Sequence, residues 1–356
     1  MKRLRVLMTA DTVGGVWTYA IELIRALPDV DFALATMGRP IREVPALPNV
    51  TGFESNYALE WMDNPWCDVD RAGEWLREIA REFRPDLIHL NGYTHAALDW
   101  NLPVIVVAHS CVLSWWRAVK ASDAPAAYGE YQRRVTAGLR AADLVVAPTA
   151  AMLHALGDHY PFGTPTRVIA NARDSLKFEP ATKHSFIFAA GRMWDDAKNL
   201  PALDAIAPRV PWPIEVAGDI IHPNGTEQRP QHIHPLGKLS DAELAGRLTS
   251  ASIYALPARY EPFGLSALEA ALSGCALVLG DIPSLREVWG DAAIFVRPDD
   301  HDALASAING LVDDELGRYE LARRARIRAL DYSPERMARE YRAAYEQLRC
   351  ETKVAA

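Results

Sequence analysis

The chain has 356 residues, of which 49% are hydrophobic and 24% are charged, and this composition excludes a largely disordered protein. The formal net charge of −8 argues against a dedicated nucleic-acid-binding protein, which needs an excess of Lys and Arg to replace phosphate counterions. The length suits two domains of about 150 residues each.

The four cysteines (Cys67, Cys111, Cys275 and Cys350) lie far apart in the sequence and form no Cys-x-x-Cys pair. This spacing predicts neither a structural zinc site nor a disulfide framework, and it fits a reducing compartment. Asp11 interrupts the first apolar run, which we therefore interpret as a strand rather than a secretory signal. No other apolar run approaches the ~20 residues needed to span a bilayer. We expect a cytoplasmic protein.

Short runs rich in β-branched residues alternate with amphipathic helical stretches along most of the chain. The first series of predicted strands comprises Leu4–Ala10, Phe32–Thr36, Leu87–Leu90, Val104–Ala108, Leu144–Ala147 and Arg167–Ala170. The second series comprises Phe186–Ala190, Ile214–Ala217, Ile253–Leu256, Ala276–Leu279 and Ala293–Val296. Several of these runs are apolar throughout, which is typical of parallel strands covered on both faces.

Alternating strands and helices predict an α/β protein built of right-handed βαβ units. The two series predict two Rossmann-like, doubly wound parallel sheets that face each other across a cleft, with a ligand at the carboxyl ends of the strands. The predicted parts are an N-terminal domain at 1–170, a linker at 171–184, a C-terminal domain at 185–332 and a final helix within 333–356. This helix has Ser333 as a plausible N-cap and Pro334 at its first position.

The turn after the first predicted strand contains Gly14 and Gly15, directly before a helix. Backbone N–H groups at a helix start can accept an anion or a polar ligand, but a tight turn that uses glycine for its backbone freedom explains the pair equally well. The turn is not G-x-G-x-x-G, and no acidic residue ends the second strand. We therefore expect no dinucleotide cofactor.

Two cations, Arg192 and Lys198, follow the first strand of the second series. At the carboxyl end of a parallel strand they stand where a diphosphate would be held, because Arg binds phosphate oxygens bidentately and Lys binds them as a point charge. The alternative is a pair of surface charges that form ion pairs with Asp195 and Asp196.

The segment from Arg259 to Ala270 reads R-Y-E-P-F-G-L-S-A-L-E-A and passes from a strand end into a helix predicted to begin near Gly264. It places Glu261 in the loop and Glu269 on the helix. The first N–H groups of this helix can receive phosphate oxygens, and a carboxylate can accept hydrogen bonds from two vicinal sugar hydroxyls. The alternative is that both glutamates are ordinary solvated or capping acids.

The E-x7-E element from Glu261 to Glu269, the Arg/Lys pair and the Gly-Gly turn resemble the retaining glycosyltransferases of family 4, which have the GT-B fold. The resemblance covers nearly the whole chain, and E-P-F-G-L-S-A-L-E is its most specific motif. It implies transfer of a hexosyl unit from a nucleoside-diphosphate sugar, a UDP- or GDP-sugar, to a hydroxyl of a glycan, glycolipid or small molecule. It also implies that the C-terminal helix crosses back to the N-terminal domain.

The resemblance carries a role to each matching residue. It places Arg192 and Lys198 on the donor diphosphate, Glu261 on the donor sugar hydroxyls and Glu269 on the nucleotide ribose. The remaining donor positions are Gly14, Gly15, Phe263, Gly264, Leu265 and Ser266. His109, in Ala-His-Ser at a strand end, matches the histidine that faces the transferred sugar, and it completes a catalytic set with Arg192, Lys198 and Glu261. A neutral histidine bonded to the backbone is the alternative for His109.

The sequence departs from the family pattern at three places. Five residues, rather than the usual four, separate Arg192 from Lys198. The interdomain Asn-Gly becomes Asn171-Ala172, and Ile282-Pro283-Ser284 stands where a glycine pair is common. We interpret these changes as subfamily features that leave the phosphate and ribose contacts intact.

The resemblance implies a front-face mechanism, in which the leaving phosphate takes the acceptor proton and His109 positions or polarises the sugar. Fixed cations and a helix terminus can stabilise the charge of the leaving diphosphate. Asp68-Val-Asp70 has the D-x-D pattern of a metal site, but it falls at a loop-to-helix transition. We therefore predict no metal and no cofactor.

Acceptor candidates follow the predicted strands of the first half, and they are Tyr93, His95, Ser110, Trp115, Trp116 and Arg117. Residues 111–140 combine a local excess of cations with paired tryptophans. A solvated helical face explains this pattern, and a weak peripheral contact with the inner face of a membrane, with a lipid-linked acceptor, is the alternative.

Two rival functions share the fold and the donor. A nucleotide-sugar 2-epimerase needs no second substrate, and a binding module without catalysis keeps the donor site alone. A nicotinamide oxidoreductase comes last, because the sequence lacks its glycine fingerprint.

Overall fold

The computed structural model describes residues 3–38, 46–221 and 229–355. The chain divides into two compact units. The first unit comprises Met1–Asn171 and Pro334–Ala356, and the second comprises Ala172–Ser333. The chain therefore crosses between the units twice, between Asn171 and Ala172 and again between Ser333 and Pro334.

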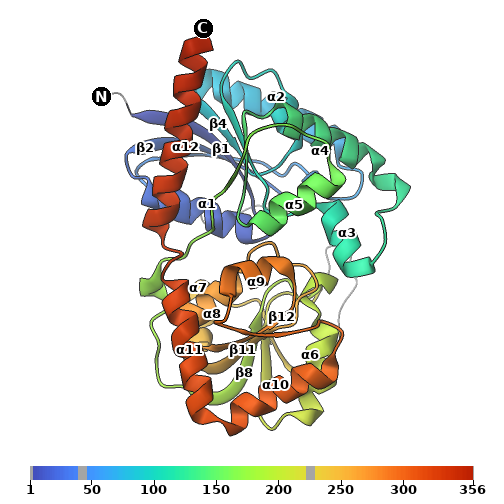
Figure 1. Ribbon diagram of the computed structural model, residues 1–356. Helices are drawn as coiled ribbons and strands as arrows, with labels where there is room; N and C mark the ends of the chain where they lie inside the picture. The colour runs from blue at the N-terminus through green and yellow to red at the C-terminus, as the bar shows by residue number, and fades with distance from the viewer. Residues whose placement is uncertain (1–2, 39–45, 222–228, 356) are drawn as a thin grey trace. The chain divides into compact units, whose positions relative to one another are not determined.

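The described part of the first unit contains a seven-stranded parallel sheet (Figure 1). Its strands are β1 (Leu4–Asp11), β2 (Val30–Met37), β3 (Val50–Glu54), β4 (Leu87–Leu90), β5 (Val104–Val107), β6 (Leu144–Ala147) and β7 (Thr166–Val168). They lie in the order β3-β2-β1-β4-β5-β6-β7, so the strand order reverses between β1 and β4. Leu7 of β1 pairs with Ala33 of β2 on one side and with Ile88 of β4 on the other.

Helices cover the first sheet because the strands are apolar on both faces. They are α1 (Gly15–Ala26), α2 (Trp66–Phe83), α3 (Val112–Lys120), α4 (Gly129–Ala141) and α5 (Ala150–His159), with the 3₁₀ turns η1 (Thr94–Ala97) and η2 (Ala126–Tyr128). One core cluster of this unit joins Leu76 and Ile79 of α2 with Val106 of β5 and Val135 of α4.

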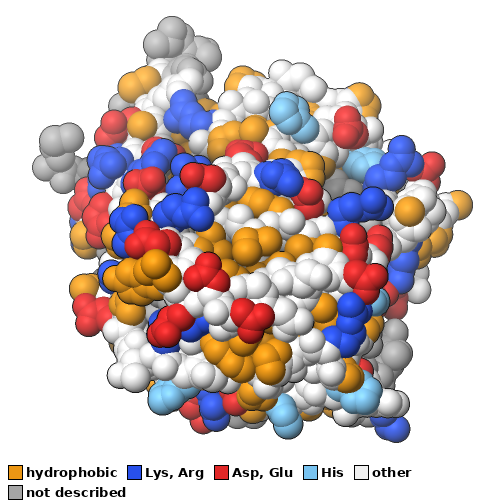
Figure 2. All heavy atoms as spheres, turned by 60° about the horizontal axis from the view of Figure 1, so that its bottom comes forward, with side chains coloured by type: hydrophobic (Ala, Val, Ile, Leu, Met, Phe, Trp, Pro, Cys, Tyr) orange, Lys and Arg blue, Asp and Glu red, His pale blue; other side chains and the backbone are white. Residues whose placement is uncertain are grey.

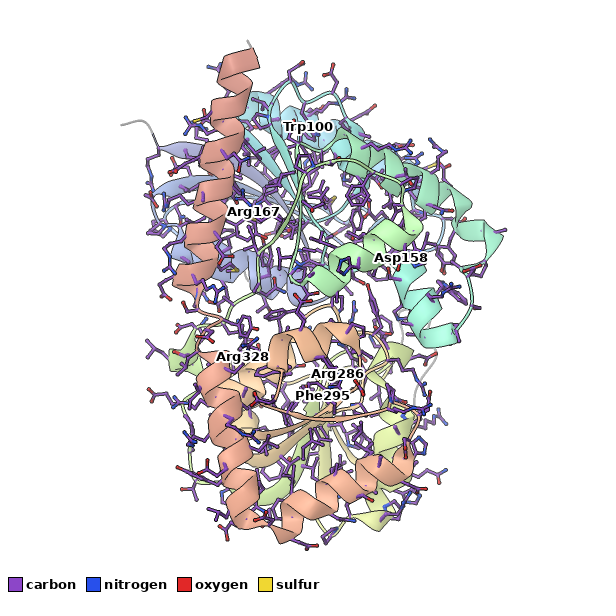
Figure 3. The ribbon with its side chains drawn as sticks, viewed as in Figure 1. Trp100, Asp158, Arg167, Arg286, Phe295 and Arg328 are labelled. Atoms are coloured by element: carbon purple, nitrogen blue, oxygen red, sulfur yellow. The ribbon has the colours of Figure 1, made fainter. Side chains whose placement is uncertain are left out.

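The C-terminal helix α12 (Pro334–Ala355) packs on α1 in the first unit (Figure 1). The guanidinium of Arg342 binds both carboxylate oxygens of Asp29 at 2.6 and 2.7 Å, and Arg167 of β7 lies 2.6 Å from Gln347 (Figure 3). Tyr345 is fully buried, and its hydroxyl lies 2.7 Å from Nδ1 of His89. Polar and aromatic contacts together hold α12 against the unit.

The described part of the second unit contains a six-stranded parallel sheet, in the order β10-β9-β8-β11-β12-β13. Its strands are β8 (His184–Ala190), β9 (Ile214–Ala217), β10 (His234–Gly237), β11 (Ala251–Leu256), β12 (Ala276–Gly280) and β13 (Ile294–Val296). The strand order reverses between β8 and β11. In open parallel sheets a ligand binds beyond the carboxyl ends of the strands at this reversal.

The helices of the second unit are α6 (Leu200–Ile206), α7 (Asp241–Ser250), α8 (Leu265–Leu272), α9 (Pro283–Trp289), α10 (His301–Asp313) and α11 (Glu315–Ala329), with the 3₁₀ turns η3 (Ser175–Lys177), η4 (Asp196–Lys198) and η5 (Ala207–Arg209). Arg328 of α11 donates to the carbonyl of Val288 in α9 at 2.8 Å, and Arg286 of α9 covers the ring of Phe295 (Figure 3).

The structure confirms the α/β architecture with two doubly wound parallel sheets. It contains two strands that the sequence analysis did not predict, β3 and β10, and each is the last strand at one edge of its sheet. An edge strand is covered less completely than a central one, so neither segment has a continuous apolar run.

The face of the molecule in Figure 2 carries Lys and Arg side chains interspersed with Asp and Glu side chains. Among the described residues, no helix has the length and the apolar character that a membrane-spanning segment requires.

Candidate functional site

In the second unit, Lys198 of η4 and Glu261 form an ion pair between Nζ and Oε2, at the carboxyl ends of β8 and β11. Both side chains are 13% exposed. Glu261 is held at two further points: its Oε1 accepts from the N–H of Gly264 at 3.0 Å, and its carbonyl accepts from the hydroxyl of Ser284. The carboxylate is therefore fixed before any ligand binds.

The loop after β11 delivers the chain into α8 through a left-handed residue. Gly264 has φ +91°, which favours glycine, and it is the N-cap of α8. The first intrahelical bond runs from the N–H of Leu268 to the carbonyl of Gly264, so the N–H groups of the first turn point out of the helix. These groups and the positive end of the helix dipole favour an anion at this end.

Ser266 and Phe263 are fixed on either side of this helix start. The hydroxyl of Tyr254 lies 2.8 Å from that of Ser266 and 3.1 Å from the carbonyl of Ala190. Phe263 is 2% exposed, and its ring packs edge-on against that of Tyr332. These contacts tie the E-P-F-G loop to the end of β8 and to the last residues of the unit.

Arg192 follows β8 and has a side chain that is 38% exposed. Its Nη2 lies 3.4 Å from Asp195, and its guanidinium lies 5.5 Å from the ring of Trp194. A side chain at Gly218 would meet the carbonyl of Gly191 at 1.7 Å, so the end of β9 packs closely on this turn. Arg192 is thus a partly exposed cation that forms the ion pair with Asp195 offered as its alternative, whereas Lys198 pairs with Glu261.

The longer loop between Arg192 and Lys198 is accommodated by η4 and by Asn199. Asn199 adopts φ +58°, and its side chain donates to the carbonyls of Pro257 and Pro298 at 3.0 and 2.7 Å. The N–H of Arg259 donates to Ala197 at 2.9 Å. The extra residue therefore leaves Lys198 beside Glu261.

Glu269 of α8 is buried, and its partner is Arg173, a residue that the sequence analysis did not single out. Nε of Arg173 lies 2.7 Å from Oε1 of Glu269, and the side chains are 10% and 8% exposed. Arg173 stands two residues after Asn171, where the chain enters the second unit. A charged side chain within the predicted linker at 171–184 was the signal that could have pointed to Arg173.

In the first unit, His109 follows β5, and its Nε2 lies 2.9 Å from Oδ1 of Asn91. The edge of the Tyr19 ring packs against the imidazole at a centroid distance of 4.5 Å. Burial lowers the pKa of His109 to about 3. His109 is therefore neutral at physiological pH. The predicted glycines lie on the same edge of the sheet, where Gly14 is the N-cap of α1 and Gly15 its first residue.

Asn91 is not among the residues predicted from the sequence, and it directly follows β4 at the reversal of the strand order. Its N–H donates to the hydroxyl of Thr9 at 2.9 Å, and its Nδ2 donates to the carbonyl of Thr9 at 2.7 Å. A polar residue at the end of an apolar strand, beside a strand that ends in histidine, was the signal that could have found it.

Two acceptor candidates, Tyr93 and His95, are bound to the protein itself. The Tyr93 hydroxyl donates to the carbonyl of Ser110 at 2.7 Å, and Nε2 of His95 lies 2.9 Å from the carbonyl of Val69. Burial lowers the pKa of His95. Both side chains therefore help to hold the loop that follows β4.

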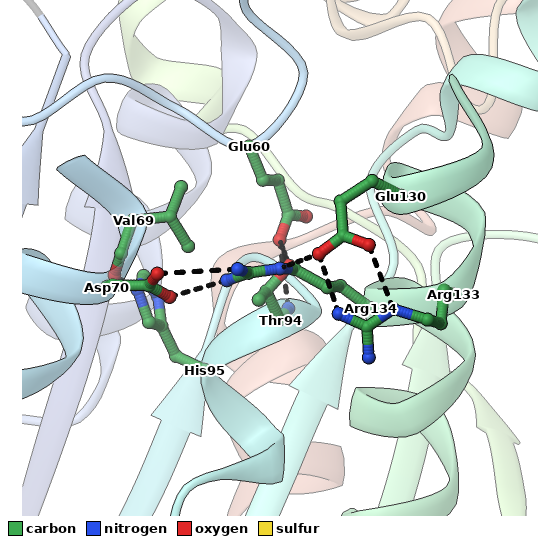
Figure 4. A network of polar contacts seen from close by, with 8 residues as sticks. All are labelled: Glu60, Val69, Asp70, Thr94, His95, Glu130, Arg133 and Arg134. Carbon is green, nitrogen blue, oxygen red and sulfur yellow. Dashed lines mark hydrogen bonds and ion pairs between the residues drawn. The ribbon is translucent and has the colours of Figure 1, made fainter. Parts of the chain in front are cut away.

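A carboxylate network fixes the same loop (Figure 4). Glu60 accepts from the N–H groups of Tyr93 and Thr94 at 3.0 and 2.8 Å, and from the Thr94 hydroxyl at 2.6 Å. Beside it, Arg134 binds Asp70 at 2.5 Å and Glu130 at 2.6 Å. These bonds stabilise the loop after β4, which carries Tyr93 and His95.

The other acceptor candidates lie on or next to α3. Trp115 and Trp116 are partly buried and pack edge-to-face at 5.7 Å, and Trp116 also contacts Tyr128. Arg117 is exposed and forms an ion pair with Asp123 at 2.9 Å, while Ser110 is exposed just before the helix. Together these residues form an aromatic surface on α3, with a neutralised arginine beside it.

The structure brings the predicted residues together in two groups. Within the second unit, the group at the carboxyl edge of the sheet comprises Arg192, Lys198, Glu261, Phe263, Gly264, Leu265, Ser266 and Glu269. Within the first unit, His109, Gly14 and Gly15 lie at the carboxyl edge.

Comparisons with known proteins agree with this architecture. The model of the family described as Glycosyltransferase Family 4 matches residues 13–175, and that described as Glycosyl transferases group 1 matches residues 226–329. The chain is 28% identical over 295 residues to a glycogen synthase from Mycobacterium tuberculosis, covering 72% of this chain and 68% of that one. It is 36% identical over 107 residues to a phosphatidyl-myo-inositol mannosyltransferase from Mycolicibacterium smegmatis, covering 29% and 28%.

Solved structures show the same fold. Sucrose-phosphate synthase from Thermosynechococcus elongatus matches with a TM-score of 0.83 at 18% identity, covering 97% of this chain and 99% of that one. HepE from Anabaena, in complex with UDP and glucose, matches with a TM-score of 0.74 at 15% identity, covering 97% and 100%. The chain belongs to the family 4 glycosyltransferases and is a transferase with the GT-B fold.

Proposed function

We propose that this glycosyltransferase moves a hexosyl unit from a UDP- or GDP-sugar to an acceptor hydroxyl, with retention of the anomeric configuration and without a metal ion. The observation that carries the proposal is the pairing of Lys198 with Glu261 beside the N-terminus of α8. The cation and the helix terminus there suit the charged oxygens of a diphosphate, and the carboxylate suits the hydroxyls of a sugar.

This arrangement of positive groups suits the negative charge that develops on the leaving diphosphate. As the bond from the anomeric carbon to the phosphate oxygen breaks, Arg192, Lys198 and the first N–H groups of α8 stabilise the negative charge. Donors fixed in advance stabilise such a transition state more than the ground state, by several kcal/mol in comparable sites. These groups supply the role that a metal ion fills in other phosphate sites.

In the proposed front-face step, the acceptor oxygen attacks the anomeric carbon from the side that the diphosphate leaves. A new carbon–oxygen bond forms, the bond to the phosphate oxygen breaks, and the leaving phosphate takes the acceptor proton. Glu261 holds sugar hydroxyls rather than attacking, because its carboxylate is already fixed by Lys198 and Gly264.

We assign the binding of the acceptor to Ser110 and to the aromatic surface of Trp115 and Trp116. A flat aromatic face suits a sugar ring. Tyr93 and His95 support this surface through the loop that follows β4, and Arg117 stands at its edge. His109 positions or polarises the transferred sugar.

We assign the enzyme to polysaccharide biosynthesis in the cytoplasm. The four cysteines all lie within the described residues and are free thiols, as a reducing compartment requires. A glycan acceptor agrees with the glycogen synthase relative, whereas the phosphatidyl-myo-inositol mannosyltransferase relative agrees with a lipid-linked acceptor. The lipid-linked acceptor and weak membrane contact form the alternative, which co-sedimentation with anionic vesicles tests.

The experiment is a thermal-shift screen of UDP-, GDP-, ADP- and TDP-sugars, followed by turnover with and without candidate acceptors. We expect a sugar nucleotide to raise Tm and to be consumed when acceptor is present. Consumption without acceptor would favour the epimerase, and stabilisation without any turnover would favour the binding module. NMR of the product reports the anomeric configuration, and an inverted product would contradict retention.

A further inference from the structure

The buried ion pair between Arg173 and Glu269 joins the start of the second unit to α8. Nε of Arg173 lies 2.7 Å from Oε1 of Glu269, and both side chains are about nine-tenths buried. Burying two charges is costly unless they pair well, and removing one partner leaves the other charged and uncompensated. The state of Glu269 therefore depends on Arg173.

Arg173 is itself held in place by several contacts. Its N–H donates to the carbonyl of Tyr332 at 3.3 Å, and its guanidinium lies over the ring of Phe178 at 5.0 Å. The Tyr332 hydroxyl donates in turn to the carbonyl of Val288 at 3.0 Å. These contacts make Arg173 a fixed cation rather than a flexible surface arm.

Two segments far apart in the sequence meet at this point. Arg173 follows the first crossing between the units, and Tyr332 precedes the second. Each contacts the proposed donor site: Arg173 binds Glu269, and the ring of Tyr332 lies 5.4 Å from that of Phe263. The donor site is therefore built partly from the ends of the second unit.

We propose that Arg173 is a positioning residue for donor recognition, which keeps Glu269 ionised and oriented to accept the ribose hydroxyls of the donor nucleotide. This inference rests on the proposed function, which assigns the ribose to Glu269. An ionised carboxylate has about four lone-pair sites, so the ion pair with Arg173 leaves capacity for a ribose. The ion pair with the fixed guanidinium of Arg173 also restrains the position of the carboxylate.

In this role Arg173 contributes to discrimination between nucleotides with and without the ribose hydroxyl, and not only to the stability of the fold. Substitution of a residue that merely stabilises the fold weakens the binding of all nucleotides alike. Substitution of a residue that acts through Glu269 weakens the binding of the nucleotide that has the ribose hydroxyl and leaves the binding of the nucleotide that lacks it unchanged. The ratio of the dissociation constant of the 2′-deoxy nucleotide to that of the matching ribonucleotide separates these roles.

The test measures dissociation constants by titration calorimetry for UDP and 2′-deoxy-UDP, and for GDP and 2′-deoxy-GDP, with the full chain. In the wild type we expect the 2′-hydroxyl to improve affinity roughly tenfold for the base that binds, the effect of one hydrogen bond to a charged group. In Arg173→Met we expect this ratio to fall toward one. In Arg173→Lys, which keeps the charge, we expect a partial recovery.

Two further variants make the outcomes distinct. Arg247→Met removes an arginine that pairs with Glu215 at 3.1 Å elsewhere in the same unit, and it should leave the ratio unchanged. Glu269→Ala should bring the ratio to one. A wild-type ratio in Glu269→Ala would refute the ribose assignment of the proposed function.

A ratio that collapses in Glu269→Ala but keeps its wild-type value in folded Arg173→Met would overturn the role of Arg173 alone. Circular dichroism and Tm establish folding. If Arg173→Met does not fold, Arg173→Lys decides: a ratio between one and the wild-type value supports the inference, and an unchanged ratio overturns it.

Discussion

Oδ1 of Asn91 lies 2.9 Å from Nε2 of His109, while Nδ2 of the same amide lies 2.7 Å from the carbonyl oxygen of Thr9. A carbonyl oxygen only accepts, so the NH₂ group of Asn91 faces Thr9 and its oxygen faces the histidine. Nε2 of His109 therefore carries the proton, and Nδ1 of the neutral ring is an acceptor. In the proposed reaction His109 accepts a hydrogen bond from the sugar and acts as neither an acid nor a cation.

The first prediction concerns His109 itself. We expect His109→Ala to lower kcat by about 10- to 100-fold, the cost of a lost hydrogen bond of about 1.5–3 kcal/mol in the transition state. The dissociation constant of UDP or GDP should stay within about twofold of the wild type, because the proposed nucleotide site consists of residues of the second unit. Steady-state kinetics and calorimetry measure the two quantities. An unchanged kcat would remove His109 from the site.

The second prediction concerns the pH dependence of stability. Burial, reinforced by His109, lowers the pKa of His89 to about 3, and its ring nitrogens lie 2.7 Å from the Tyr345 hydroxyl and 3.2 Å from the Tyr19 hydroxyl. The unfolded chain, with an ordinary histidine pKa of about 6.5, binds the proton first. The stability from neutral His89 is thus fully present above pH 6.5 and is lost as the pH falls toward 3.

We therefore expect the free energy of unfolding of the wild type to fall between pH 7 and pH 5 by about 2 kcal/mol more than that of His89→Gln. Urea unfolding at the two pH values measures both differences. His109 is present in both proteins, so its own contribution cancels in the comparison. Equal pH dependence in the two proteins would show that His89 does not titrate as its burial requires.

The third prediction concerns Lys198. We expect Lys198→Ala to lower kcat/KM by about 10²- to 10³-fold, because one fixed donor to the proposed leaving group is lost and Glu261 loses its ion-pair partner. The matched control is Lys238→Ala, which removes an exposed lysine from the same unit. Comparable losses in the two variants would argue against a specific role for Lys198.

The fourth prediction concerns metal ions. Since Arg192, Lys198 and the start of α8 provide the positive charge in the proposed site, we expect full activity after dialysis against EDTA. Turnover is measured before and after dialysis, and again with added Mg²⁺ or Mn²⁺. Activity that disappears in EDTA and returns with either ion would show that the protein groups alone are insufficient.

The central strands could be predicted from sequence because each is a continuous apolar run. β3 and β10 could not, because their positions follow from pairing with β2 and β9 rather than from their own residues. β3 contains Gly52, and β10 contains Pro235, both of which weaken a strand signal.

The residues from Glu261 to Glu269 could be singled out because they form one short, specific motif, and in the structure they lie with Arg192 and Lys198 at the carboxyl edge of the second sheet. Gly14 and Gly15, the other predicted donor positions, lie in the first unit. Asn91 and Arg173 could not be assigned roles in the same way. Their contacts join segments that are distant along the chain: Arg173 and Glu269 are brought together only by the second unit's fold. Such pairings depend on tertiary structure, which local sequence patterns do not report.

The most direct measurement is a crystal structure of the enzyme with bound UDP or GDP. We expect the diphosphate to contact Arg192, Lys198 and the first N–H groups of α8, and the ribose hydroxyls to bind Glu269. A nucleotide bound elsewhere, with Arg192 and Glu269 making no contact with it, would contradict the account.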